Sequence, residues 1–180
     1  TRYWNLDKGN MIQVGEEEAI GQFNQLFHQS VNRRLRADVS IGTSLSGGLD
    51  SSSVVAAIHQ QLSVNDFYQQ QTFTAGFPNY EKDETSYAKI VATQFGLKQY
   101  FTQPSAGNLA DELVKLVQHH EEPISSASVY AQYKVFELAK QHNVKVLLDG
   151  QGADEILAGY PKYIHWFLQE QLSNRQFRLY

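Results

Sequence analysis

The chain has 180 residues, 42% of them hydrophobic, and a formal net charge of −4. This length and composition favour a globular protein with its own apolar core, and the acidic balance gives no basic footprint for a nucleic acid. The sequence has no cysteine, which excludes disulfides and cysteine-ligated metals. No apolar run approaches the roughly 20 residues that span a bilayer. We therefore expect a cytoplasmic protein that binds neither nucleic acid nor membrane.

Apolar spacing predicts helices and strands that alternate along the chain. A helix over 16–35 begins with acidic residues and ends with arginines, as the helix dipole favours. The elements expected after it are a strand over 39–45, a helix over 53–62, a strand over 71–76, a helix over 84–95 capped by Asp83 and followed by Gly96, a strand over 98–101, helices over 109–117 and 128–142, a strand over 145–148, a helix from Ala153 and an amphipathic helix from Trp166.

This alternation predicts an α/β fold, with a mostly parallel sheet flanked by helices on both faces. In such a sheet the ligand lies beyond the carboxyl ends of the strands, at the point where the strand order reverses. Loops that follow the strands are therefore the places to look for a site.

The most informative loop is Ser46-Gly47-Gly48-Leu49-Asp50-Ser51-Ser52, between the first predicted strand and its helix. Two glycines permit a tight turn and a close approach to a ligand, and the helix start directs free N–H groups at an anion. Asp50 fits such a site when Mg²⁺ accompanies a polyphosphate. The loop lacks the lysine of the Walker A motif. We expect it to bind a nucleotide, the alternative being a turn that only joins a strand to a helix.

The loop resembles the pyrophosphate loop, S-G-G-x-D-S-[ST], of the N-type ATP pyrophosphatases, the PP-loop superfamily with the adenine nucleotide alpha hydrolase-like fold. The resemblance implies that the loop holds the pyrophosphate of ATP while a substrate carbonyl oxygen attacks the α-phosphorus.

A second glycine-rich turn, Asp149-Gly150-Gln151-Gly152-Ala153-Asp154-Glu155, follows the last predicted strand. Both turns should lie on one edge of the sheet. Asp154 could then join Asp50 around one Mg²⁺, with phosphate oxygens and water completing the shell. The alternative is that Asp154 or Glu155 only caps a helix, which would not require so glycine-rich a turn. For Asp149, contact with a ribose and exposure to solvent both stay open.

The two turns and the following Gly159-Tyr160 together resemble the synthetase domain of the glutamine-dependent asparagine synthetase family. The resemblance covers nearly the whole chain. Further matching segments occur in the same order, namely Tyr3-Trp4, Arg36-Ala37-Asp38-Val39, Thr72 to Phe77, the acidic pair Asp83-Glu84, and Glu122-Pro123 with Ser125, Ser126 and Tyr130.

The resemblance implies a role for each matching position. Leu45 and Ala75 would contact adenine through their backbones, Asp149 and Gly150 would lie near the ribose and α-phosphate, and the pyrophosphate would be held by Ser46, Gly47, Gly48, Ser51 and Ser52. Asp50 and Asp154 would bind Mg²⁺, and Gln151 would lie at the reacting centre. The amino-acid substrate would be contacted by Glu122, Ser126 and Tyr130.

The implied reaction is the ATP-dependent synthesis of asparagine. The aspartate β-carboxylate is adenylylated with release of pyrophosphate, and ammonia then displaces AMP. Two positions depart from many family members, which have Glu in place of Gln151 and Ser in place of Asp149. Glutamine keeps hydrogen bonding but loses the charge and the base.

Other functions stay open for this sequence. One alternative is a relative that forms a β-lactam or a macrolactam, and another is a non-catalytic nucleotide-binding protein, which Gln151 favours and the two aspartates disfavour. An argininosuccinate or GMP synthetase is disfavoured by the second turn.

We expect residues 1–180 to be the N-terminal portion of the synthetase domain of a longer protein. The sequence has no initiator Met. The resemblance implies that the glutaminase domain, with its N-terminal cysteine, and the C-terminal half of the synthetase domain, with its catalytic lysine, are outside this sequence. Such a fragment should bind nucleotide without completing the reaction, with the glutaminase domain of the parent chain as a partner. The oligomeric state, a homodimer included, stays open.

Overall fold

The computed structural model of the chain describes residues 1–3, 5, 7, 9, 12–61, 70–81 and 83–173. These fall into two compact units, Thr1–Arg36 and Ala37–Tyr180. The first unit contains helix α1 (Glu16–Arg34), which confirms the predicted helix to within one residue. Glutamates occupy its first turn and arginines its last turn, so both ends complement the helix dipole.

The second unit is built on a parallel sheet of strands β1 (Ile41–Ser44), β2 (Gln71–Ala75), β3 (Lys98–Thr102) and β4 (Val146–Leu148). The strand order is β3-β2-β1-β4. The chain therefore adds β2 and β3 on one side of β1 and then returns to place β4 on the other side. The strand order reverses between β1 and β4, which is where parallel α/β sheets bind their ligands.

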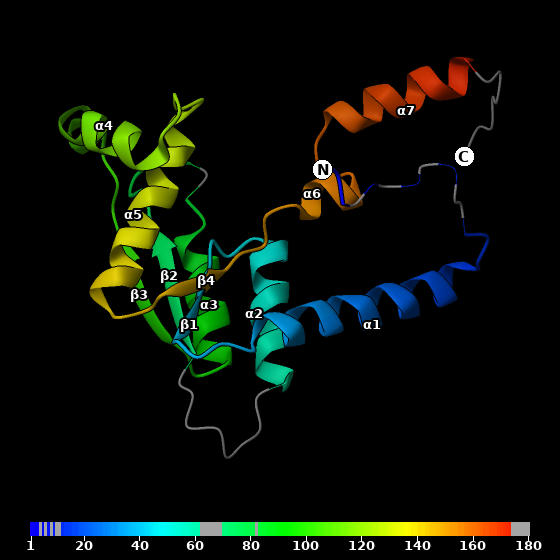
Figure 1. Cartoon of the computed structure of the whole chain (residues 1–180), viewed down its shortest axis with the longest axis horizontal. Coiled ribbons are helices and arrows are strands. Elements are labelled where there is room, and N and C mark those ends of the chain that lie inside the picture. The colour runs from blue at the N-terminus through cyan, green and yellow to red at the C-terminus, as the bar shows by residue number, and fades with distance from the viewer. Residues whose placement is uncertain are drawn as a thin grey trace. The chain divides into compact units, whose positions relative to one another are not determined.

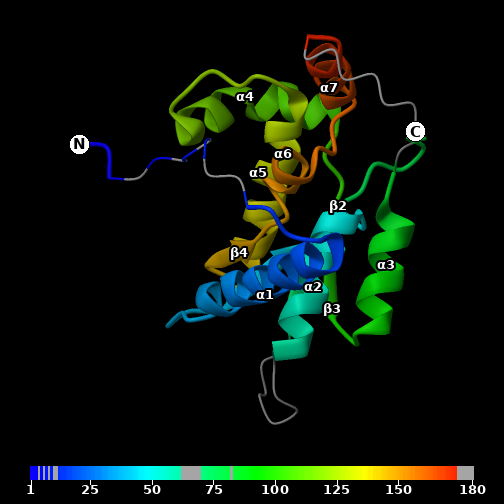
Figure 2. The ribbon, with the colours of Figure 1, turned by 90° about the vertical axis from the view of Figure 1, so that its right-hand side faces the viewer.

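Helices cover both faces of this sheet, as predicted (Figure 1). Helices α2 (Leu49–Gln61) and α3 (Thr85–Gln94) lie side by side on one face (Figure 2), where Val55 packs with Ala88 and Ala92. On the other face α5 (Ala127–Gln141) packs Val135 and Ala139 against Phe73 of β2. The remaining helices are α4 (Ala106–His120), α6 (Ala153–Leu157) and α7 (Lys162–Ser173). Within the described ranges, no helix has both the length and the apolarity to cross a membrane.

Several helices begin earlier than the sequence predicted. Helix α2 begins at Leu49, because the Ser52 N–H already donates to the Gly48 carbonyl at 3.1 Å. The serines and the aspartate of this segment favour turns, but the first turn of a helix accommodates them equally well. Helix α4 begins at Ala106 behind a Ser105 cap, whose hydroxyl accepts the Asn108 N–H. The expected helix end at Leu62, the segment 174–180 and Trp4 lie outside the described residues.

The capping role predicted for Asp83 is wrong by one residue. Helix α3 begins at Thr85, and Glu84 occupies the N-cap position without a side-chain cap bond. The Asp83 carboxylate instead accepts bonds from the Phe77 N–H and the Thr85 hydroxyl, so it closes the loop that precedes the helix. At the other end of α3, Gly96 has φ +64° and follows the helix as predicted.

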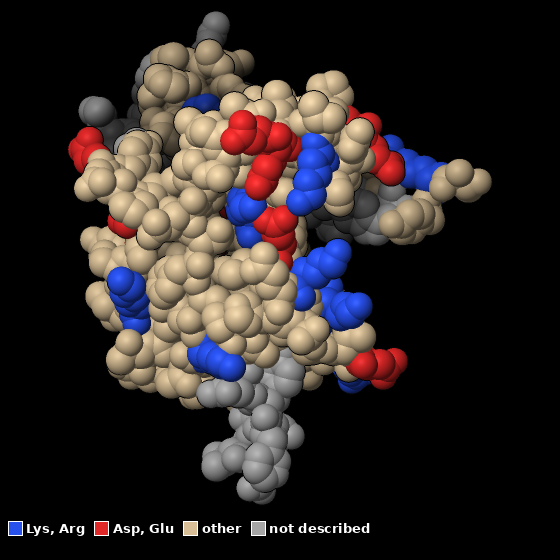
Figure 3. Space-filling view, turned by 90° about the vertical axis from the view of Figure 1, so that its left-hand side faces the viewer, with Lys and Arg blue, Asp and Glu red and all other residues tan. Residues whose placement is uncertain are grey.

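Acidic and basic side chains lie next to one another on the side of the molecule that includes α4 and α5 (Figure 3). Lys134 pairs with Glu112 at 3.2 Å and also with Glu137, and Lys115 pairs with Glu137 at 3.1 Å. Two of these partly exposed pairs, Lys134–Glu112 and Lys115–Glu137, link α4 to α5, and each contributes little to stability.

Truncation of Leu116 should show that α4 depends on its packing. This side chain on α4 is 1% exposed, whereas Val114 on the same helix is 70% exposed. We expect Leu116→Ala to lower the free energy of unfolding by about 2–5 kcal/mol, and Val114→Ala to change it by less than about 0.5 kcal/mol. Urea unfolding of both variants measures this, and equal losses would contradict the observed burial.

Candidate nucleotide and magnesium site

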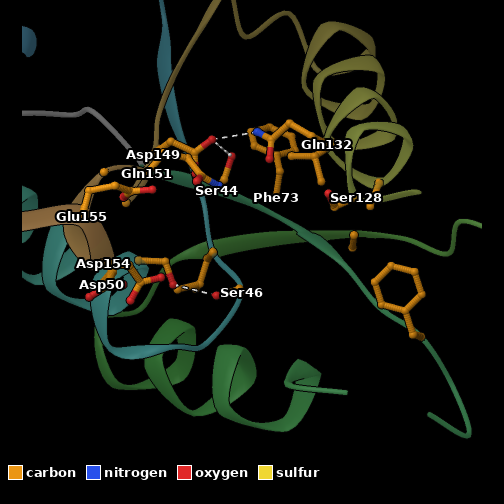
Figure 4. Close-up of a pocket in the computed structure, with 18 of the residues that line it drawn as sticks. Ser44, Ser46, Asp50, Phe73, Ser128, Gln132, Asp149, Gln151, Asp154 and Glu155 are labelled. Atoms are coloured by element: carbon orange, nitrogen blue, oxygen red, sulfur yellow. Dashed lines mark hydrogen bonds between the residues drawn. The ribbon is translucent and has the colours of Figure 1, made fainter. Parts of the chain in front are cut away.

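A pocket of about 340 Å³ lies at the carboxyl ends of the strands, where β1 and β4 meet (Figure 4). It brings together most of the residues that the sequence singled out. The first loop and the end of β1 contribute Ser44, Leu45, Ser46, Asp50 and Ser51, the segment around β2 contributes Phe73, Ala75 and Phe77, helix α5 contributes Ser128, Ala131, Gln132 and Val135, and the second turn and its surroundings contribute Asp149, Gly150, Gln151, Gly152, Asp154, Glu155 and Tyr160.

The first loop is held in shape by its own glycines and serines. Gly47 has φ +100°, in the region that favours glycine. A Cβ atom there would lie 2.5 Å from the Ala88 nitrogen and 2.8 Å from the Glu84 carbonyl oxygen, so the loop rests directly on the start of α3. The Ser46 hydroxyl accepts the Gly48 N–H at 3.1 Å, and the Ser51 hydroxyl donates to the Gly48 carbonyl at 3.2 Å.

The start of α2 supplies the anion-binding capacity of the pocket. Because Ser52 is the first residue whose N–H bonds back to the loop, the N–H groups of Leu49, Asp50 and Ser51 have no intrahelical partner. The positive end of the helix dipole adds to these donors. Ser46 and Ser51 line the pocket, whereas Gly47, Gly48 and Ser52 shape the loop beside it.

The second turn packs directly against the first. A Cβ atom on Gly150 would lie 2.9 Å from the Ser51 nitrogen and 3.1 Å from the Asp50 Cβ, so only glycine allows this approach. Asp50 and Asp154 both line the pocket and lie toward the same end of it in Figure 4. The two turns therefore share one edge of the sheet, as the sequence predicted.

These two carboxylates suit a magnesium ion. Mg²⁺ prefers oxygen ligands and is commonly held by one or two carboxylates together with substrate phosphates and water. In the described part of the chain, no three His, Asp or Glu side chains are grouped for a metal. Asp50 and Asp154 supply two carboxylates to one pocket, and their coordination of Mg²⁺ stays a prediction.

Asp149 lines the pocket directly after β4. Its Oδ2 accepts a hydrogen bond from the Gln132 side-chain amide at 2.7 Å and another from the Ser44 hydroxyl at 3.3 Å (Figure 4). Asp149 lines the pocket and is partly buried, and its contact with a ribose stays a prediction.

Helix α5 forms a pocket wall that the sequence analysis missed. Its four lining residues are spaced at i, i+3, i+4 and i+7, which places them on one face of the helix. That spacing was the available signal. The wall consists of Ser128, Ala131, Gln132 and Val135.

The residues predicted to contact the amino-acid substrate lie elsewhere. Glu122 and Ser126 are exposed and do not line the pocket. Tyr130 is 2% exposed and lies on another face of α5, where its hydroxyl donates to Glu112 at 3.0 Å. Burial, and then the hydrogen bond to Glu112, raises the pKa of Tyr130. In this arrangement Tyr130 joins α5 to α4 and is not among the residues that line this pocket.

The predicted adenine side of the pocket is only partly available to a ligand. Ala75 and Leu45 both line the pocket. However, the Leu45 N–H already donates to the Phe73 carbonyl at 3.0 Å, and the Leu45 carbonyl accepts the Thr74 hydroxyl at 2.6 Å. Of the Leu45 backbone groups, only the second lone pair of the carbonyl oxygen is therefore available to a donor on adenine.

The loop after β2 is fastened by Asp83, and this contact should respond to pH. The Phe77 N–H and then the Thr85 hydroxyl, bonded at 3.0 and 2.7 Å, hold the pKa of Asp83 below its ordinary value. Because the folded pKa is depressed, the contact stabilises the loop above the unfolded pKa of about 3.9 and is lost as the pH falls through the folded value.

Thr85→Val removes one donor and should raise the pKa of Asp83 toward its ordinary value. An NMR titration of the side-chain carboxyl carbons measures it. Thr93→Val, an exposed change on the same helix, should leave that pKa where it is. An unchanged titration in Thr85→Val would contradict the hydrogen-bond origin of the shift.

Comparison with known proteins is consistent with this geometry. The family described as asparagine synthase matches residues 22–179. Glutamine-hydrolyzing asparagine synthetase 1 of Bacillus subtilis is 32% identical over 167 residues, which cover 92% of this chain and 24% of that protein. A putative glutamine-hydrolyzing asparagine synthetase 2 of Methanocaldococcus jannaschii is 33% identical over 168 residues, covering 92% of this chain and 31% of that protein. The chain thus spans about a quarter to a third of the length of these relatives.

Among solved structures, the U34-tRNA thiolase NcsA of Methanococcus maripaludis resembles this chain with a TM-score of 0.53 at 16% identity. The similarity covers 82% of this chain and 53% of the thiolase. At this identity the likeness concerns the fold, and it confirms the predicted α/β class.

Proposed function

Because this chain belongs to the asparagine synthase family, we propose that its pocket binds ATP with Mg²⁺ and serves an ATP-dependent ligase that converts the aspartate side-chain carboxylate into an amide. The observation that carries the proposal is the meeting of two glycine-rich turns in one pocket. Each turn contributes a carboxylate, and the first leads into the start of α2 with its free N–H groups.

Each part of the pocket has a task in this proposal. The N–H groups at the start of α2 and the hydroxyls of Ser46 and Ser51 hold the pyrophosphate of ATP. Asp50 and Asp154 hold Mg²⁺, which neutralises phosphate charge when it is bound. Gly150 lets the α-phosphate approach the second turn, and the adenine lies toward Ala75.

The reaction has two steps. A carboxylate oxygen of aspartate attacks the α-phosphorus of ATP, and the bond from that phosphorus to the bridging oxygen breaks, so pyrophosphate leaves. Ammonia then attacks the acyl carbon, the bond to the AMP oxygen breaks, and the nitrogen loses a proton to give asparagine and AMP. The protein contributes by positioning the reactants and stabilising developing charge.

Gln151 lines the pocket on the second turn and is exposed to it. Its amide can donate to one reacting oxygen and accept from the attacking nitrogen. An amide cannot take up a proton at neutral pH, so the proton released from the nitrogen passes to another acceptor. We assign Gln151 an orienting role at the reacting centre.

The relatives are glutamine-hydrolyzing by name, and the chain covers a limited part of their length. We propose that residues 1–180 form the N-terminal portion of a synthetase domain that receives ammonia from a glutaminase domain. Placement of this activity in the cytoplasm, the contacts of Glu122, Ser126 and Tyr130 with the amino acid, and a homodimer remain predictions.

The test uses the protein in its full natural length with ATP, Mg²⁺, aspartate and ammonia. AMP and pyrophosphate formed only when aspartate is present would support the proposal. ADP and phosphate would overturn the assignment of the first loop. Pyrophosphate released with another carboxylate, and not with aspartate, would assign the pocket to a relative with a different acceptor, such as a lactam-forming enzyme.

A further inference from the structure

Two polar side chains from separate elements converge on one carboxylate oxygen of Asp149 in the pocket. Ser44 ends β1, Gln132 lies on the pocket face of α5, and Asp149 directly follows β4. Both Ser44 and Gln132 donate to Oδ2 of Asp149 (Figure 4). Asp149 alone was singled out from the sequence, and its two donors have no assigned role in the proposed reaction.

The two donors orient the carboxylate and leave its charge in place. An amide and a hydroxyl are neutral, so neither places a positive charge beside the carboxylate. Within the described residues, Oδ1 of Asp149 has no hydrogen-bond partner. With Oδ2 held from two sides, Oδ1 is the oxygen left to receive a donor from a ligand.

The surroundings restrict what that donor can be. The described residues that line the pocket include four acids and no Lys, Arg or His. A phosphate oxygen facing Asp149 would be repelled by its charge, whereas a hydroxyl group can donate to it. Asp149 follows β4, bonds to Ser44 at the end of β1, and precedes Gly150, which lies against the phosphate-binding turn. A ribose hydroxyl is the donor that a bound nucleotide would present there.

We propose that Gln132 is a positioning residue which, together with Ser44, aims the Asp149 carboxylate at the ribose hydroxyls of the nucleotide. This inference rests on the proposed binding of ATP in the pocket. A residue of α5, which lies outside both glycine-rich turns, would then set the preference of the pocket for ribose over deoxyribose.

The test compares the affinity for three nucleotides. The protein in its full natural length is titrated calorimetrically with ATP, 2′-deoxy-ATP and 3′-deoxy-ATP in the presence of Mg²⁺. The unaltered protein should bind ATP about 10-fold more tightly than at least one deoxy analogue, since a hydrogen bond to a charged acceptor is lost. In Gln132→Met this ratio should fall at least threefold, while the affinity for that deoxy analogue changes less than twofold.

A matched control and a second variant keep the result interpretable. Gln141→Met alters an exposed glutamine at the end of the same helix and should leave all three affinities unchanged. Ser44→Ala removes the longer of the two bonds to Asp149 and should lower the ratio by a smaller factor. Circular dichroism verifies that each variant is folded, and the Ser44→Ala result decides the matter should Gln132→Met fail to fold.

The possible failures are distinguishable. Equal weakening of ATP and both deoxy analogues in Gln132→Met would show a structural role and overturn the positioning role alone. A ratio near one in the unaltered protein would overturn the contact between Asp149 and ribose. Absence of Mg²⁺-dependent ATP binding by the unaltered protein would overturn the proposed function and this inference with it.

Discussion

Asp50→Asn and Asp154→Asn should each abolish the Mg²⁺ dependence of ATP binding. Both carboxylates line the pocket beside the start of α2, and we expect each variant to bind ATP about 100-fold more weakly than the unaltered protein at saturating Mg²⁺, since a metal ligand with its charge is lost. Without Mg²⁺, each variant should bind ATP more tightly than the unaltered protein, because a carboxylate repels the phosphates and an amide does not.

Calorimetric titration with ATP, in Mg²⁺ and in EDTA, measures both halves of this prediction. Asp111→Asn removes an exposed carboxylate on α4 and serves as the control for net charge. The metal assignment fails if the two pocket variants respond to Mg²⁺ as the unaltered protein does.

Gly47→Ala should unfold the first loop, whereas Gly48→Ala should be tolerated. The methyl group at position 47 would meet the Ala88 nitrogen of α3 at 2.5 Å and the carbonyl oxygen of Glu84, just before α3, at 2.8 Å, in a residue with φ +100°. At position 48 the closest atom is the Ser46 hydroxyl oxygen at 3.3 Å, which can give way. The two neighbours therefore provide a matched pair within one loop.

We expect Gly47→Ala to lower the free energy of unfolding by about 2–5 kcal/mol, from backbone strain and overpacking combined, and to eliminate ATP binding. Gly48→Ala should cost less than about 1 kcal/mol. Urea unfolding followed by ATP titration tests the pair. Similar losses in both variants would show that the packing of the loop on α3 does not set its conformation.

The fold and the two turns were predictable from the sequence because local chemistry specifies them. Alternating strand and helix patterns, together with glycines directly after two strands, required a parallel sheet with both turns at one edge. The lengths of the helices were less accessible, since Asp50, Ser51 and Ser52 favour turns as strongly as a first helical turn.

The walls of the pocket were harder to predict, because they depend on which face of a helix meets the sheet. Tyr130 and Gln132 are two residues apart on α5, yet Tyr130 is buried against α4 and Gln132 lines the pocket. The packing of Val135 and Ala139 on Phe73 sets this rotation. A single sequence shows the helical period but does not fix where the period begins relative to a neighbouring element.

The reversal of strand order between β1 and β4 also dictates when the pocket can form during folding. The bond between Ser44 and Asp149 joins residues 105 positions apart, and the bond from Ser40 to the Asn143 carbonyl joins residues 103 apart. Such contacts require a long loop to close first, which makes them slow relative to local helix formation. During synthesis on a ribosome, the first loop would emerge before β4, and the pocket could form only after β4 had emerged and paired with β1. Nucleotide binding would then report that this long-range pairing is complete, and by binding only the paired state it would hold that state together.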